Sequence, residues 1–239
     1  MPNALHHQTR EHGFESDEFL VSLSEHFESC EFKPGQVLLR DRLCIEDCFL
    51  VQRGLVTILS DVGDQSLVES ALVGPGGLVG ISTILGVDSV GYRAVALTEC
   101  RTTKISSEVL QFELERFPQL RSSLNKYAYF RLAEAMQLSG CNATHRIEQR
   151  LSRWILRASD MLGNAPIAIT HNALAGLLGV RRASVTEGLH SLESELAIRS
   201  RRGRLEVRDR ARLEQLACRC YAALKSESVA AFSDACLDG

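Results

Sequence analysis

The sequence predicts an α+β protein in which an antiparallel β-barrel or roll comes first, a long helix follows, and two short helices with a β-hairpin come last. Three observations support this order. Short apolar runs separated by Gly, Pro and Asp recur between residues 32 and 105, which is typical of antiparallel strands. Residues 119–139 contain neither Pro nor Gly and repeat apolar positions at helical spacing. Residues 169–207 combine two helical patterns, joined at a Gly, with a hairpin pattern.

The N-terminal elements follow from the spacing of apolar and turn-forming residues. Residues 18–30 are expected to form a short helix with four apolar side chains on one face: Phe19, Leu20, Leu23 and Phe27. Residues 32–40 predict a turn and then a strand. Further strands are expected at residues 48–54, 55–59, 66–73, 92–97 and 101–105, with turns at residues 61–64 and 74–77. Residues 107–116 predict another short helix, and Pro118 suits the first turn of the next one.

The long helix carries an apolar seam whose spacing averages the 3.5-residue repeat of a coiled coil. Its members are Leu124, Ala128, Leu132, Ala135 and Leu138. The seam favours pairing with a second copy of the chain, although the helix could instead pack on its own β-roll. Residues 140–142 predict a hinge, with Asn142 as the N-cap of the following helix. The apolar residues expected to form a core in that helix are Ile147, Leu151, Trp154, Ile155 and Met161.

Residues 169–192 predict two short helices joined by a tight turn. The hydroxyl of Thr170 can accept a hydrogen bond from the free N–H groups of the first helix, and Gly179 can adopt the left-handed conformation that ends it. The inward-facing residues are expected to be Leu174, Leu177, Leu178, Val185, Leu189 and Leu192. This is the pattern of a helix-turn-helix whose second helix enters the major groove of DNA, although an ordinary helical hairpin has the same periodicity.

Basic side chains gather around this motif. Residues 198–207 predict a β-hairpin with Gly203 at its turn, and a basic hairpin after a recognition helix forms a wing. The expected partner is therefore double-stranded DNA. The candidate base-reading residues are Arg181, Arg182, Ala183, Ser184, Thr186 and Glu187. The candidate phosphate contacts are Thr170, His171, Arg199, Arg201, Arg202 and Arg204. Asp209 is expected to cap a last helix.

Charge is divided unevenly along the chain. The net charge is −3, yet residues 142–220 hold 14 Lys and Arg against 8 Asp and Glu, whereas residues 1–141 hold 12 against 19. A basic block beside an acidic one favours a nucleic-acid-binding unit attached to another unit, although most basic blocks are solvated surface. No apolar run reaches the roughly 18 residues of a membrane span, and residues 1–17 lack the apolar part of a secretory signal. A cytoplasmic protein with no membrane partner is therefore expected.

The spacing of the cysteines does not indicate a metal site. Eight are scattered along the chain, and neither Cys44 with Cys48 nor Cys218 with Cys220 has a second pair or His partners at zinc-ligand spacing. We expect reduced, small, buried hydrophobic residues in a reducing compartment, and we assign no metal and no cofactor. A redox switch at Cys141 is an alternative hypothesis.

The chain is not expected to be an enzyme. It contains no Ser-His-Asp arrangement, no paired carboxylates in a Gly-rich context and no phosphate-binding Walker loop. Residues 74–80 are rich in glycine, but they lie between strands and do not open a helix, so they predict a β-turn.

The segment LAGLLGVRRASVTEGLHSLE, followed by IRSRRGRLEVRDRARLEQLA, resembles the DNA-binding domain of the Crp-Fnr (cyclic-AMP receptor protein / fumarate-nitrate regulator) family of bacterial transcription factors. The N-terminal strands and turns resemble the same family's cyclic-nucleotide-binding-like β-roll, a cupin-like jelly roll. The resemblance implies a homodimer that binds inverted-repeat operators and contacts RNA polymerase. The cysteine cluster of the family's iron–sulfur branch is absent from this sequence.

The resemblance also implies a division of the chain. The expected parts are a flexible N-terminus at 1–17, a β-roll effector domain at 18–118, a dimerisation helix and hinge at 119–141, a winged helix-turn-helix at 142–220 and a weakly specified tail at 221–239.

The β-roll departs from the family where the family binds a cyclic nucleotide. The family's cassette has Gly-Glu-Leu followed later by Arg-Ser/Thr-Ala, whereas this chain has Gly80-Ile81-Ser82 and, at the phosphate positions, Val90-Gly91. Ile81 cannot accept a hydrogen bond from a ribose hydroxyl, and Val90 would leave a buried phosphate uncompensated. The remaining candidate pocket residues are Arg93, Ala135 and Met136. We expect no cyclic-AMP binding unless Arg93 acts through a shifted loop. The alternative is a regulator that responds to a cyclic nucleotide or another small ligand through a non-standard pocket.

Two further departures concern DNA recognition. The family's base-reading positions match Arg182, Ala183 and Glu187, so the operator half-site is expected to differ from the family consensus. Arg182 can donate two hydrogen bonds to guanine, Ala183 offers only a methyl contact, and Glu187 either accepts from cytosine or points away. Where the family usually has a Gly before the wing, this chain has Glu195-Leu196. We expect strain at Leu196 if the backbone there needs a positive φ.

Overall fold

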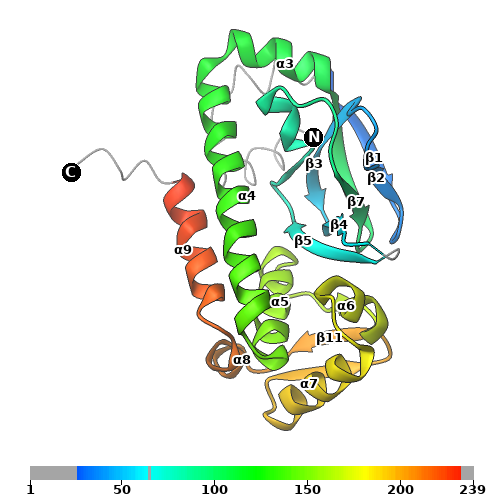
Figure 1. Ribbon diagram of the computed structural model, residues 1–239, viewed down its shortest axis with the longest axis vertical. Helices are drawn as coiled ribbons and strands as arrows, with labels where there is room; N and C mark the ends of the chain where they lie inside the picture. The colour runs from blue at the N-terminus through cyan, green and yellow to red at the C-terminus, as the bar shows by residue number, and fades with distance from the viewer. Residues whose placement is uncertain (1–25, 64–65, 233–239) are drawn as a thin grey trace, which may run out of the picture.

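The computed structural model describes residues 26–63 and 66–232, which form three parts arranged along one long axis (Figure 1). A β-roll lies beside one half of a long helix, and a smaller α+β unit lies at the helix's other end. This is the fold class that the sequence predicts. Most of the helix expected at residues 18–30 lies outside the described residues. Residues 28–30 belong to a strand instead, because they pair with residues 102–104 of another strand.

The β-roll consists of two four-stranded antiparallel sheets, with strand orders β1-β8-β3-β6 and β2-β7-β4-β5. The strands are β1 Glu28–Phe32, β2 Val37–Leu39, β3 Asp47–Arg53, β4 Val56–Asp61, β5 Leu67–Val73, β6 Leu78–Val79, β7 Tyr92–Ala96 and β8 Cys100–Ser106. Each predicted strand is present. The sequence does not predict β6 or the short 3₁₀ helix η1 at Ile81–Leu85, because such short elements have too little periodicity.

The first hydrophobic core fills the roll. Its inward residues alternate along strands, as in β7, where Ala94 and Ala96 are buried and Arg93 and Val95 are less so. Helix α3, Ser107–Arg116, and the first turns of the next helix close one end of the roll, since their leucines join this core. The roll is therefore a packed unit with its own core.

The helix break between the two units lies further along the chain than the sequence predicts. Helix α4 extends over Pro118–Thr144, and α5 extends over Ile147–Met161. Residues 140–142, the predicted hinge, continue α4, and Arg146 takes the place of Asn142 as the N-cap of α5. A helix interior tolerates one Gly at a cost of about 1 kcal/mol. The burial of Cys141 against the C-terminal part of the chain holds this last stretch of helix in place.

The apolar residues of α4 are divided between two faces. Leu124 and Leu138 are buried within the chain. Their assignment to a seam that pairs with a second copy is therefore wrong. They turn inward because α4 covers other parts of its own chain. Tyr129, Leu132 and Met136 are 60%, 59% and 67% exposed, and they lie three and four residues apart. Of the predicted seam, Leu132 and Ala135 are exposed and Ala128 is half-buried, while Tyr129 and Met136 of the exposed stripe are not members of the seam.

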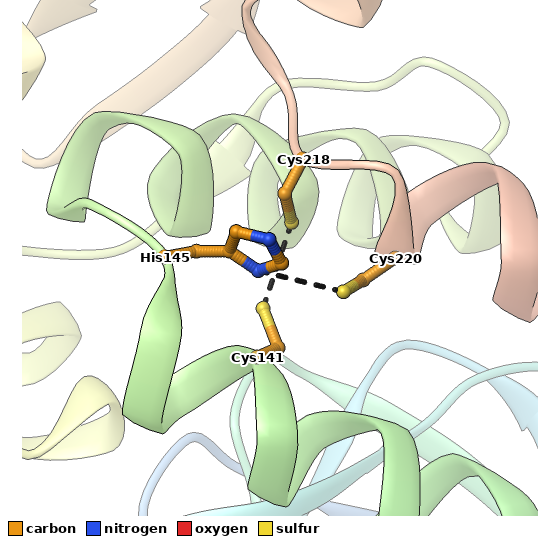
Figure 2. Close-up of side chains that lie close together, drawn as sticks. All are labelled: Cys141, His145, Cys218 and Cys220. Atoms are coloured by element: carbon orange, nitrogen blue, oxygen red, sulfur yellow. Dashed lines mark hydrogen bonds between the residues drawn. The ribbon is translucent and has the colours of Figure 1, made fainter.

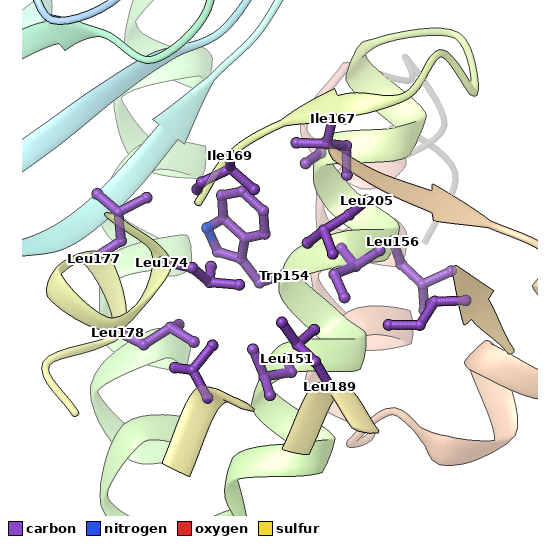
Figure 3. Close-up of a cluster of buried hydrophobic side chains, with 14 of the residues drawn as sticks. Leu151, Trp154, Leu156, Ile167, Ile169, Leu174, Leu177, Leu178, Leu189 and Leu205 are labelled. Carbon is purple, nitrogen blue, oxygen red and sulfur yellow. The ribbon is translucent and has the colours of Figure 1, made fainter. Parts of the chain in front are cut away.

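A second core joins the roll to the C-terminal unit (Figure 3). Trp154 of α5 lies at its centre, surrounded by aliphatic side chains of the helix-turn-helix and the wing. Leu55, Leu59 and Leu72 of the roll belong to the same cluster. Burying one such leucine contributes about 1.5–3 kcal/mol. The two units are therefore held together by hydrophobic packing as well as by the chain connection.

Two carboxylates, one half-buried and one fully buried, reinforce this junction. Glu69 of β5 accepts hydrogen bonds from the Trp154 indole at 2.8 Å and the Thr57 hydroxyl at 2.9 Å, and its burial raises the pKa of this carboxyl to about 7. Glu134 of α4 is fully buried and forms ion pairs with Arg131, at 2.8 Å, and with Arg157 of α5. These contacts link β5 and α4 to α5.

The C-terminal segment forms two more helices, α8 at Arg210–Leu216 and α9 at Cys220–Phe232. The predicted cap is confirmed, since Asp209 Oδ1 accepts a hydrogen bond from Arg212 N at 2.9 Å. The sequence leaves the tail after residue 220 weakly specified. The structure corrects this, because α9 is a helix that lies along α4 (Figure 1). Burial of Tyr221 and Leu224 holds it there. None of the helices in the described part of the chain is long and apolar enough to cross a membrane.

Replacing Glu69 with Gln is expected to change the pH dependence of folding. The folded chain keeps the Glu69 proton up to about pH 7, whereas an unfolded Glu releases it near its ordinary value of 4.5. As pH falls from 7 towards 4.5, the free energy of unfolding of the wild type should rise relative to that of Glu69→Gln, by about 1–3 kcal/mol. Urea denaturation at several pH values measures this difference. Glu99→Gln, at an exposed carboxylate, is the control and should follow the wild type; a Glu69→Gln curve parallel to the wild type would contradict the prediction.

Candidate nucleic-acid interface

Helices α6, His171–Leu178, and α7, Arg182–Ser194, form the predicted helix-turn-helix. Thr170 Oγ1 accepts a hydrogen bond from Ala173 N at 3.1 Å and caps α6. Gly179 ends α6 with a φ of 63°, a conformation that glycine adopts without steric cost. The predicted inward-facing residues are all buried: Leu174, Leu177, Leu178, Val185, Leu189 and Leu192. These sequence predictions are confirmed.

The first turn of α7 presents its polar side chains to solvent. Arg181, Arg182, Ala183 and Glu187 are exposed, and Ser184 is partly buried. The opposite face of α7 packs closely on α5 at Gly188, where a Cβ atom would lie 2.6 Å from Leu151 Cδ1. Figure 1 shows α7 at the end of the molecule remote from α3. The candidate base-reading face is therefore open, while the buried face fixes the position of the helix.

His171 connects the two helices to the wing. Its Nδ1 lies 3.1 Å from Thr186 Oγ1, and its Nε2 lies 3.2 Å from Ser200 Oγ. Because the Thr186 hydroxyl donates to the Arg182 carbonyl at 3.1 Å, it accepts from His171 Nδ1–H. Ser200 N also donates to Glu193 Oε1 at 2.6 Å. His171 and Thr186, predicted as DNA contacts, thus hold α6, α7 and the wing in register.

The wing is the hairpin of β10, Ile198–Arg201, and β11, Arg204–Val207, with β9, Ile167–Ala168, as its third strand. Gly203 stands at the turn as predicted. Arg202 and Gly203 have φ values of 43° and 78°, as a type I′ turn requires. Arg201 pairs with Arg204 across the hairpin, and both are exposed. The two positive charges of this pair repel each other, so an anion bound at the tip of the wing would reduce the repulsion.

Leu196 carries the strain that the sequence predicts. Its φ is 56° and its side chain is 75% exposed, so the left-handed backbone is not offset by burial of the side chain. The left-handed conformation costs an L-residue roughly 1–2 kcal/mol. The backbone between α7 and the wing therefore has the conformation that a Gly adopts easily, and Leu196 adopts it at a higher conformational energy.

The cassette positions of the β-roll are occupied by core side chains. Val90 is 6% exposed, and Ile81 packs against the same cluster, together with Tyr92 and Tyr127. Burial raises the pKa of Tyr127, whose hydroxyl accepts from Leu78 N at 3.0 Å. Gly80 has a φ of 93° and caps the short helix η1, Ser82 is the second residue of that helix, and Gly91 is exposed.

The other candidate pocket residues lie outside this core. Arg93 forms an ion pair with Asp41, and the hydrogen bond from Arg93 lowers the pKa of the Asp41 carboxyl. Ala135 and Met136 are exposed on α4. The structure therefore does not gather the predicted pocket residues into one cavity.

One group of side chains comes together only in the folded chain. Cys218 and Cys220 lack partners nearby in the sequence, but the fold brings them to Cys141 and His145, with all four ligand atoms within 4.8 Å of one another (Figure 2). Spacing along the chain cannot reveal this group. Cys141 and His145 meet Cys218 and Cys220 only because α9 packs on α4.

A β-roll connected by a long helix to a winged helix-turn-helix defines the class of two-domain DNA-binding regulators, and comparison with known proteins agrees. A cyclic nucleotide-binding domain model matches residues 29–117, and a Crp-like helix-turn-helix domain model matches residues 149–216. The transcriptional regulator SdrP of Thermus thermophilus is 28% identical over 203 residues, which cover 80% of this chain and 94% of the relative. The cyclic AMP receptor protein of the same organism is 29% identical over 211 residues, which cover 86% and 95%.

A solved structure shows the same fold. FixK2 from Bradyrhizobium japonicum matches with a TM-score of 0.70 and 16% identity, over 80% of this chain and 98% of that chain. The chain belongs to the Crp-Fnr family of transcriptional regulators, which act by binding DNA and are not enzymes.

Replacing Leu196 with Gly is expected to stabilise the chain by about 1 kcal/mol, because the strain of the left-handed leucine exceeds the extra entropy of an unfolded glycine. For a chain of this size, the melting temperature should rise by roughly 2–4 °C in differential scanning calorimetry. Leu43→Gly is the control, because Leu43 is 55% exposed but has no positive φ. It should melt at or below the wild-type temperature, and equal melting of Leu196→Gly and wild type would show that the backbone is unstrained.

Proposed function

We propose that this chain acts as a homodimer on inverted-repeat operators and does so without cyclic AMP. The observation that carries the proposal is the exposure of arginines at both the first turn of α7 and the tip of the wing. His171 joins these two surfaces through hydrogen bonds, so they approach DNA as one rigid unit.

Base recognition is assigned to the exposed first turns of α7. Arg182 can donate in a bidentate manner to guanine O6 and N7, and the Ala183 methyl can contact thymine. Glu187 is exposed on the same helix and can accept from a cytosine amino group. Arg181 and Ser184 flank these positions. Thr186 is assigned a positioning role through its contacts with His171 and the Arg182 carbonyl.

The wing is assigned to the phosphate backbone. Arg201, Arg202 and Arg204 are exposed around the turn, while Arg199 is partly buried opposite Glu206. Arg202 occupies a positive-φ position where Asn or Gly is ordinarily favoured. A cation at this strained position is consistent with a contact to phosphate, which contributes affinity and no sequence information.

Dimerisation is assigned to the exposed stripe Tyr129, Leu132 and Met136. The spacing of three and four residues is that of the core positions of a coiled coil. An isologous pair of α4 helices would place two recognition helices about 34 Å apart, which matches successive major grooves on one side of DNA.

Independence from cyclic AMP is supported by the packing of the roll. Val90 and Ile81 belong to the core at the positions where the family binds phosphate and ribose, and Arg93 is already paired with Asp41. A cyclic phosphate placed there would lose its hydration and gain no cation, at a cost of several kcal/mol.

Control by another small ligand is the second candidate function. A cavity of about 500 Å³ opens between the roll, α4, α5 and α9, and its lining includes Tyr127, Arg131, Arg157 and Tyr221. This volume is in the range of ligand sites, and its walls belong to both units. A ligand bound there could change how the DNA-binding unit sits on the roll.

Selection of bound sequences from a random DNA library, with and without cyclic AMP, tests the proposal. We expect an inverted repeat with half-sites about ten base pairs apart, recovered equally in both conditions. A repeat that requires cyclic AMP would contradict the proposal and assign Arg93 or its loop to the nucleotide. Failure of the folded chain to enrich any sequence would favour control by another ligand.

Two matched variants then separate the roles of α7 and the wing. Arg182→Ala should lose roughly 1–3 kcal/mol of binding, concentrated at one guanine of the half-site. Arg201→Ala should weaken binding to all sequences alike and reduce the salt dependence by about one unit of slope. Uniform weakening by Arg182→Ala would assign Arg182 to a phosphate.

Replacing Leu132 with Glu is expected to convert the dimer to a monomer, because two buried carboxylates would face each other across the α4 pair. Light scattering after size-exclusion chromatography measures the mass. Leu43→Glu is the control, because Leu43 is 55% exposed and lies between β2 and β3 of the roll, outside α4. A Leu132→Glu chain that stays dimeric would place the interface elsewhere.

A further inference from the structure

Four potential metal ligands converge where α4 ends and α9 begins. Cys141 lies in the last turns of α4, and His145 is its C-cap residue, four positions later on the same side of the helix. Cys218 follows α8, and Cys220 opens α9. Figure 2 shows the three sulfur atoms and the imidazole ring directed towards a common centre. From this convergence we propose that Cys141, His145, Cys218 and Cys220 bind one Zn²⁺ ion.

The distances between ligand atoms suit a tetrahedral zinc ion. Cys141 Sγ lies 3.5 Å from Cys218 Sγ, and Cys220 Sγ lies 3.6 Å from His145 Nδ1. With Zn–S bonds of about 2.3 Å and a Zn–N bond of about 2.0–2.1 Å, a tetrahedron requires roughly 3.8 Å between sulfurs and roughly 3.6 Å between sulfur and nitrogen. The remaining separations are no greater than 4.8 Å, so small side-chain rotations complete the site.

The type and burial of the ligands indicate a structural zinc site. Three thiolates and one imidazole are a common set for structural zinc, and sulfur ligands disfavour magnesium, calcium and manganese. Cys141, Cys218 and Cys220 are 1%, 4% and 2% exposed. They form a small cluster apart from the two hydrophobic cores. His145 is half-buried, and with it the three buried cysteines supply four protein ligands, which leave no open position for water or substrate.

The surroundings can compensate the charge of such a site. Zinc with three thiolates and a neutral imidazole carries one net negative charge. Arg153 is 3% exposed, its charge acts on the thiols of Cys141 and Cys218, and its Nε has no hydrogen-bond partner within the described residues. Gln137 Nε2 donates to Cys220 Sγ at 3.0 Å. A buried guanidinium beside the cluster is costly next to neutral thiols, and it is stabilised next to a metal thiolate.

The zinc ion would fix the junction of the two units. Cys141 and His145 lie on either side of the last turn before α5, and Cys218 and Cys220 lie on either side of the entry to α9. Metal ligation therefore connects the end of the long helix to the C-terminal end of the DNA-binding unit. A disulfide between Cys141 and Cys218 would use only two of these side chains and would leave the convergence of His145 and Cys220 unexplained.

Metal analysis of the full-length chain tests this inference. Protein purified under reducing conditions without chelators should contain about one zinc per chain by plasma mass spectrometry. Cys220→Ser and His145→Ala should each lower the affinity for zinc at least roughly tenfold. Cys44→Ser is the matched control, because Cys44 is exposed and outside the cluster, and it should retain the wild-type zinc content. Circular dichroism confirms that each variant is folded.

A second readout uses the wild-type chain alone, in case the variants do not fold. Zinc is removed with a chelator and replaced with Co²⁺, which should give the visible absorption of tetrahedral cobalt with thiolate ligands. Folded, reduced wild-type chain with neither bound zinc nor this absorption would overturn the inference. It would also be overturned by stoichiometric iron with inorganic sulfide, or by an intramolecular Cys141–Cys218 disulfide that forms in place of metal binding. None of these results depends on DNA binding.

Discussion

The hydrophobic packing around Trp154 is the constraint on which the arrangement of the protein depends. The indole lies where the outer side of the β4–β5 region, the first helix of the helix-turn-helix and the wing meet, and Glu69 accepts its only polar hydrogen (Figure 3). In a core packed to the density of a crystal, the position of each wall depends on the others. The orientation of α7 is thus set by the β-roll as well as by its own domain. Any signal that reaches the roll through β5 has a short physical path to the DNA-binding surface.

The surface that we propose faces DNA contains backbone conformations that stability alone would not favour. Leu196 and Arg202 both have positive φ, one where the chain leaves α7 and the other at the tip of the wing. Backbone hydrogen bonds hold these conformations. Leu196 N donates to the Glu193 carbonyl at 2.9 Å, and Arg201 pairs with Arg204 on either side of the turn that contains Arg202. Strained residues that persist in this way often occur at functional surfaces. Here they border the two elements assigned to contact DNA.

Much of the fold follows from the sequence because it is encoded locally. Thr170 caps a helix, Gly179 ends it and Gly203 forms a turn. Each role depends only on the residue itself and on neighbours a few positions away, so each can be predicted. The inward face of the helix-turn-helix is equally local, since its leucines repeat at helical spacing. The candidate base-reading positions could be named for the same reason.

The errors arise where distant segments decide the outcome. Leu124 and Leu138 fit a seam by spacing, but they are buried within the chain, and only their location in the fold shows it. The hinge predicted at Gly140 is helical because Cys141 is held by residues from the far end of the chain. The sequence predicts His171 as a DNA contact, but its bridge between Thr186 and Ser200 depends on the wing folding back onto α6.

The packing of α9 along α4 also governs the order in which the chain can be completed. The β-roll has its own core and can fold as soon as it leaves the ribosome, whereas the last turns of α4 wait for residues made roughly eighty positions later. Until Cys218 and Cys220 arrive, the end of the long helix near Cys141 lacks its covering segment. The end of the long helix is therefore ordered in the same step that completes the C-terminal unit. A product truncated before α9 would lack the contacts that order the junction.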